Sequence, residues 1–187
     1  FSLPAFDMDS KLVLIALCLF AISSVNKVTA ADNDVWKVLT RSDNFFLVKR
    51  TYPRGGNQCA YMKAQNRDGG KHTLSAVMGY RDPATGQMVS PSTYTVTVTQ
   101  GPGSSTYNMM TVQTSSSSSG LKYELVYTDG GNCNILKGKG GPLNEKCELW
   151  APESGAGNVG GDCDTQFETR CGKAVETPYQ QDCTIPK

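Results

Sequence analysis

From residue 45 onward, apolar and polar side chains alternate along the chain in a series of short runs. A period of two places successive side chains on opposite faces, which is typical of strands with one buried face. Glycine, proline and small polar residues separate the runs and suit tight turns. The pattern predicts eight strands, at residues 45–52, 58–65, 72–81, 87–100, 106–114, 121–129, 133–138 and 146–151.

Short strands joined in succession by tight turns form an antiparallel meander. Eight such strands can close into a barrel that leaves no exposed edge and has room for one small ligand. The predicted fold class is therefore all-β, an eight-stranded antiparallel up-and-down barrel. We interpret the serine run at 115–119 as a mobile loop at a hairpin tip, not as a domain linker.

The segment before the first strand has a different period. Residues 31–41, ADNDVWKVLTR, predict a short helix that Asp32 or Asn33 caps. In that helix Trp36 and Leu39 lie about one turn apart and share one side. We expect this helix to precede the barrel.

A second helix is predicted after the last strand. Residues 163–175 have helical composition, and Phe167 is their main apolar anchor. Cys163 and Cys171 lie about two turns apart on this helix. The remaining tail returns to extended chain, and we expect Cys183 to tie it down.

The first part of the chain reads as a leader. Lys11 precedes an apolar run at 12–22, and small residues follow up to Ala30. This order is typical of a secretory signal peptide, and the run is shorter than the ~20 residues of a membrane-spanning helix. We expect cleavage after Ala30, so that 1–30 are upstream residues and leader, and 31–187 form a single domain.

Charge and motif content argue against several classes of function. The net charge is +1, whereas a nucleic-acid partner requires a basic face. The single histidine, His72, has no catalytic or ligand partner nearby, and no GxSxG motif or phosphate loop occurs. We therefore predict no catalytic residue, no cofactor, no metal, and neither a nucleic-acid nor a membrane partner. We expect a secreted, extracellular monomer that binds a small-molecule ligand.

Cysteine usage agrees with export. An even number of cysteines in an exported chain predicts disulfides, and spacing alone leaves their connectivity open. No CxxC pair occurs, which argues against a zinc site. Six cysteines follow the predicted leader, and they are Cys59, Cys133, Cys147, Cys163, Cys171 and Cys183.

The last two predicted strands place polar side chains on the inner face. On a strand, Glu148 and Trp150 point the same way, opposite to their neighbours Cys147 and Leu149. If Trp150 faces the barrel interior, both cysteines of the stretch 133–150 face outward and can meet the C-terminal helix. By the same alternation, Asn134 faces inward.

These residues resemble the tick salivary lipocalins, which include the histamine-binding proteins and their soft-tick relatives. The similarity spans nearly the whole chain after the leader, and its most specific part is the amine-binding signature of that family. The signature has Asp where this chain has Asn134. Its elements here are Cys133-Asn134-Ile135, a gap of twelve, Glu148-Leu149-Trp150, a gap of twelve, and Cys163.

The resemblance implies a disulfide pattern and a function. It implies the pairs Cys133–Cys163 and Cys59–Cys183, and it leaves Cys147 for Cys171. The implied function is a secreted salivary protein that captures a host inflammatory or haemostatic mediator and is not an enzyme.

A biogenic amine such as histamine or serotonin is the first ligand class that the resemblance implies. A carboxylate can pair with the ammonium group, and aromatic faces can contact the cation and the ring. The residues that we expect to bind it are Glu148, Trp150, Asn134, Tyr123 and Tyr127. Asn134 removes one formal charge, and a neutral hydrogen bond is weaker than a charge-assisted one.

Two alternatives remain open. The family also binds eicosanoids such as leukotrienes and thromboxane, which carry a carboxylate and an apolar tail. Methionines suit such a tail, and a basic side chain suits the carboxylate. The candidates are Met62, Met78, Met109 and Met110 for the tail, and Arg81 or Lys137 for the carboxylate. The third class is a protein-binding inhibitor that uses the barrel loops.

Overall fold

The computed structural model describes residues 32–114, 116 and 119–187. The predicted leader and its cleavage site lie outside these residues, as does most of the serine run. Eight antiparallel strands form a closed barrel in chain order, which confirms the predicted fold class. The strands are β1 (Asn44–Arg50), β2 (Gln58–Asp68), β3 (Thr73–Arg81), β4 (Ser92–Thr99), β5 (Met109–Thr114), β6 (Leu121–Thr128), β7 (Asn134–Gly138) and β8 (Cys147–Pro152).

The fourth strand is shorter than predicted. It begins at Ser92, whereas the alternation suggests a start at residue 87. Pro91 cannot donate a backbone hydrogen bond to a neighbouring strand, so the pairing starts only after it. The segment before it forms a loop, with an isolated bridge between Arg81 and Met88.

The N-terminal helix α2 (Val35–Arg41) closes one end of the barrel. Its cap is Asp34, whose side chain accepts a hydrogen bond from the Lys37 amide at 3.0 Å, so the expected caps Asp32 and Asn33 were wrong. Three apolar side chains of this helix join the core inside the barrel, and they are Val35, Val38 and Leu39. We call this end of the barrel the closed end.

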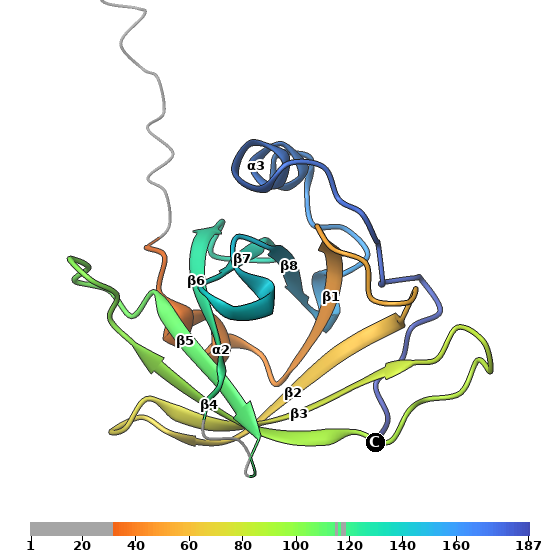
Figure 1. The fold of residues 1–187 in the computed structure, drawn as a ribbon, viewed down its shortest axis with the longest axis horizontal. Helices are drawn as coiled ribbons and strands as arrows, with labels where there is room; N and C mark the ends of the chain where they lie inside the picture. The colour runs from red at the N-terminus through yellow and green to blue at the C-terminus, as the bar shows by residue number, and fades with distance from the viewer. Residues whose placement is uncertain (1–31, 115, 117–118) are drawn as a thin grey trace, which may run out of the picture.

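The C-terminal helix α3 (Gly161–Cys171) packs on the outer wall of the barrel. Figure 1 shows it outside the strands, with the following chain running past β1 and β2. Phe167 is 1% exposed and belongs to a cluster with Ile135 and Leu149 on the outer face of β7 and β8. The helix ends four residues earlier than expected, because Gly172 adopts a φ of 81° and stops it.

Three disulfides attach the C-terminal part of the chain to the barrel. They are the same pairs that the resemblance implies, Cys59–Cys183, Cys133–Cys163 and Cys147–Cys171. Two of them fix α3 over β7 and β8, and the third fixes the tail to β2. No helix in the described ranges is long and apolar enough to cross a membrane.

Gly138 provides a test of the packing at the end of β7. A Cβ atom at this position would collide with the backbone carbonyl of Leu143, in the short helix η1 (Gly141–Leu143). We expect Gly138→Ala to lower the free energy of unfolding by about 1–3 kcal/mol, measured by chemical denaturation. Gly69→Ala is the matched control, because a Cβ there meets no atom within 4 Å, and an equal loss in both variants would contradict this account.

Candidate ligand-binding site

A cavity of about 410 Å³ occupies the barrel interior. Its lining extends from α2 at the closed end to the loops at the other end, which we call the open end. The β1–β2 loop (residues 51–57) and the β3–β4 loop (residues 82–91) lie at the open end and contribute Arg54, Asn57 and Ser90 to the lining.

Glu148 is the acidic side chain of this cavity. It is the second residue of β8, close to the open end, and is 6% exposed. Its carboxylate accepts hydrogen bonds from the Trp150 indole at 2.8 Å, from the Tyr123 hydroxyl at 3.4 Å, and from the Tyr52 hydroxyl. None of the described lysine or arginine side chains forms an ion pair with it. The buried carboxylate therefore has hydrogen-bond donors but no ion-pair partner among the described residues, although Arg50 and Arg54 line the same cavity.

Tyr52 reaches this carboxylate because β1 is irregular. The pairing of β1 with β8 shifts register between Leu47 and Lys49, so that the alternation changes phase and Arg50 and Tyr52 face the cavity. Burial, followed by the charge of Glu148, raises the pKa of Tyr52 and that of Tyr123 well above the ordinary value. Both phenols therefore remain protonated and donate to the carboxylate. Periodicity alone did not identify Tyr52.

Glu176, in the C-terminal tail, holds the loop that contains Tyr52. Its carboxylate accepts hydrogen bonds from the backbone N–H groups of Arg54 and Gly56 and from the side chain of Arg50 at 2.6 Å. Burial acts to raise the pKa of Glu176, but these hydrogen bonds and the Arg50 charge hold it below its ordinary value. The backbones of Arg50 and Glu176 also pair as an antiparallel bridge.

Asn134 lines the cavity near the closed end and is 2% exposed. Its side-chain oxygen accepts hydrogen bonds from the Thr128 hydroxyl at 2.8 Å and from the Arg41 guanidinium at 3.2 Å. Its amide nitrogen donates to the Trp150 carbonyl at 3.0 Å. A resident cation, Arg41, therefore already contacts this position.

The structure separates the two tyrosines that were expected to bind the ligand, Tyr123 and Tyr127. Tyr123 lines the cavity, but Tyr127 lies on the outer wall with the cluster under α3. The Tyr127 hydroxyl donates to Asp162, and the Arg170 guanidinium lies over its ring. The pairing of β6 with β7 shifts register between Leu125 and Tyr127, which reverses the alternation, so the predicted role of Tyr127 in ligand binding was wrong.

The residues that were expected to bind an anionic, lipid-like ligand also need correction. Met109 does not line the cavity, because it neighbours the inward Met110 on a strand, whereas the other three methionines do line it. Arg81 pairs with Asp182 outside the barrel, and Lys137 bonds the Arg170 carbonyl beside α3. The basic side chains that line the cavity at its open end are Arg50, which pairs with Glu176, and Arg54, and these predictions missed both.

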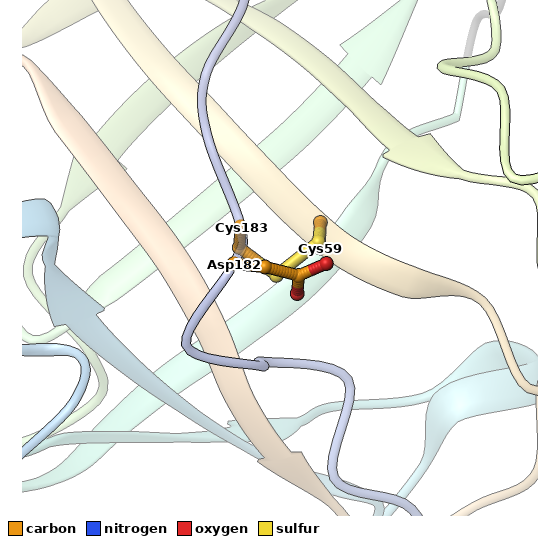
Figure 2. A group of neighbouring side chains, drawn as sticks. All are labelled: Cys59, Asp182 and Cys183. Atoms are coloured by element: carbon orange, nitrogen blue, oxygen red, sulfur yellow. A yellow bond between two sulfur atoms is a disulfide. The ribbon is translucent and has the colours of Figure 1, made fainter.

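Three potential metal ligands meet at the tail. Figure 2 shows Asp182 beside the Cys59–Cys183 disulfide. Both sulfur atoms are consumed by the disulfide, and the Asp182 carboxylate pairs with the Arg81 guanidinium at 2.8 Å. These residues therefore do not fit a metal site.

A closed barrel with one terminal helix inside its end and one on its wall defines a lipocalin-type ligand-binding protein. Residues 24–185 match the family described as tick histamine binding protein. The chain belongs to this family, and its members are lipocalins that bind small ligands.

Solved structures agree with this assignment. The chain is 25% identical to AM182, determined in complex with serotonin, with a TM-score of 0.61 over 81% of this chain and 94% of that one. It is 16% identical to Japanin from Rhipicephalus appendiculatus, determined with bound cholesterol, with a TM-score of 0.57 over 76% and 95%. Lobster apocrustacyanin A1 shares the fold at 14% identity and a TM-score of 0.52, over 82% and 89%.

The lowered pKa of Glu176 predicts a pH-dependent contribution to stability. A carboxylate whose pKa is lower in the folded than in the unfolded protein stabilises the fold above the unfolded pKa. That contribution is lost as the pH falls through the folded pKa. We expect Glu176→Gln to be less stable than the wild type at neutral pH, and the difference to vanish in acid. Denaturation at both pH values measures it.

Glu168→Gln, on the exposed side of α3, is the control for this measurement. It should differ little from the wild type at either pH. A Glu176→Gln deficit that does not change with pH would contradict the role of the charge.

Proposed function

We propose that this protein is a secreted capture protein for a biogenic amine of the host, and that Glu148 is the counter-charge for the ammonium group. The observation that supports this most is the buried carboxylate of Glu148 without an ion-pair partner among the described residues. Burying an isolated charge costs several kcal/mol unless a cation pairs with it. A bound ammonium would supply that pairing.

The surroundings of Glu148 suit an arylalkylamine. Tyr52, Tyr123 and Trp150 offer aromatic faces within the cavity, where a cation and a ring can both contact them. The similarity to the serotonin complex of AM182 favours the same class of ligand for this chain. Capture requires no reaction, so one protein would remove one ligand from the host fluid.

Secretion is the second part of the proposal. The predicted leader at residues 1–30 and three disulfides both favour an oxidising, extracellular location. We take residues 31–187 as the mature single domain. A mediator-binding protein of this kind would act in saliva.

Two single substitutions in the cavity, one at Glu148 and one at Asn134, test whether Glu148 is the counter-charge of the amine. Glu148→Gln keeps the shape but removes the charge, and we expect serotonin and histamine affinity to fall at least about tenfold by calorimetry. Asn134→Asp adds a charge that Arg41 neutralises, so we expect a change below about threefold. Retained affinity in Glu148→Gln, or no amine binding by the wild type, would overturn the proposal.

A carboxylate ligand such as an eicosanoid is a second candidate, and Arg54 is the observation that favours it. No hydrogen bond or ion pair joins its guanidinium to another side chain in the described ranges, although it lines the cavity. Most of the other side chains that line the cavity are apolar, as a lipid tail requires.

The Arg54→Gln variant separates this candidate from the first. If the ligand is a leukotriene, its affinity should fall at least about tenfold in Arg54→Gln and change little in Glu148→Gln. Calorimetry with leukotriene and serotonin on both variants gives the answer. An unchanged leukotriene affinity in Arg54→Gln would exclude Arg54 as the partner of the leukotriene carboxylate.

A further inference from the structure

The lining of the cavity changes character between its two ends. Glu148, Tyr52 and Arg54 lie toward the open end, where β8 begins and β1 ends. Toward the closed end the lining consists, apart from Asn134, of apolar side chains from α2 and from the adjoining ends of the strands. These include Val35, Val38 and Leu39 of α2 and Phe45 at the start of β1.

The polar group at the closed end does not need a ligand. The oxygen of Asn134 accepts two hydrogen bonds, and its amide nitrogen donates one. Because the Arg41 guanidinium is one of its partners, a second ammonium at this position would meet a like charge. The lower part of the cavity is therefore unsuited to a second amine.

The size of the cavity exceeds the needs of a small amine. A volume of about 410 Å³ lies in the range of sites that bind drug-sized molecules. A histamine molecule bound at Glu148 would leave the apolar part of the cavity toward the closed end unfilled. Apolar surface that stays unfilled contributes nothing to affinity, whereas each methylene group buried there strengthens binding.

We propose that the preferred ligand is an amine with an extended apolar substituent, whose ammonium group pairs with Glu148 and whose apolar part reaches α2. This inference rests on the proposed function, because it uses the same carboxylate. Met62, Met78 and Met110 also line the cavity, and their flexible side chains adapt to tails of irregular shape. The ligand class is thus a lipophilic amine, bound once per barrel.

A homologous series of straight-chain primary amines, from butylamine to decylamine, tests this inference on the wild-type protein. We expect the Kd to fall about fourfold for each added methylene group until the chain reaches α2, and then to level off. The corresponding alkyl carboxylates are the matched ligands without the cation. They should bind more weakly at equal length, and Glu148→Gln should remove the preference for amines.

A variant at the closed end tests where the tail lies. Val38→Phe adds volume at the bottom of the cavity, so decylamine affinity should fall more than butylamine affinity. Thr40→Phe, at an exposed position of the same helix, should leave the affinities for butylamine and decylamine as they are in the wild type. Circular dichroism of both variants verifies that they fold.

The outcomes separate this inference from the proposed function. Amine affinity that depends on Glu148 but not on chain length would overturn the lipophilic ligand and leave amine capture intact. Affinity that rises with chain length equally for amines and carboxylates, with or without Glu148, would overturn both. Failure of every amine to bind would overturn the proposed function itself.

Discussion

The burial of the Glu148 charge is the constraint on which the open end of the barrel depends. A carboxylate that is 6% exposed needs several donors, and they come from three different parts of the chain. Trp150 donates from the same strand, Tyr123 from β6, and Tyr52 from the loop after β1. Satisfying the charge therefore fixes the position of these three segments relative to one another, and it does so at the place where a ligand would enter.

The tail on the outer wall supports the inner site. Glu176 holds the loop of residues 51–57 through two backbone N–H groups and the side chain of Arg50. The Cys59–Cys183 disulfide fixes the same tail to β2. The loop is thus attached on its outer side by one carboxylate and on its inner side by another, with Tyr52 between them. A cavity whose rim is held in this way loses less conformational entropy when a ligand binds.

The sequence predicted the parts of this structure that regular alternation controls. It gave the eight strands, the outward cysteines and the inward Glu148 and Trp150, because β7 and β8 pair without interruption there. It failed at two register shifts, in β1 and β6, which no glycine or proline marks in the chain. One shift turns Tyr52 into the cavity, and the other turns Tyr127 out of it. Pairing partners that are distant in sequence create these bulges, so periodicity within one strand cannot reveal them.

Asn134 has a different meaning in the structure than in the sequence pattern. The family signature has Asp at this position, so Asn134 removes one negative charge that could pair with an amine ligand. Yet the Asn134 oxygen accepts hydrogen bonds from Thr128 and Arg41, and its amide nitrogen donates one to the Trp150 carbonyl. An amide can satisfy all three, whereas a carboxylate would face the carbonyl oxygen with no proton to share. The Asn134 amide thus joins β7 to β8 at Trp150, whose indole donates to Glu148. Through this contact Asn134 helps to position the Trp150 side chain beside the Glu148 carboxylate.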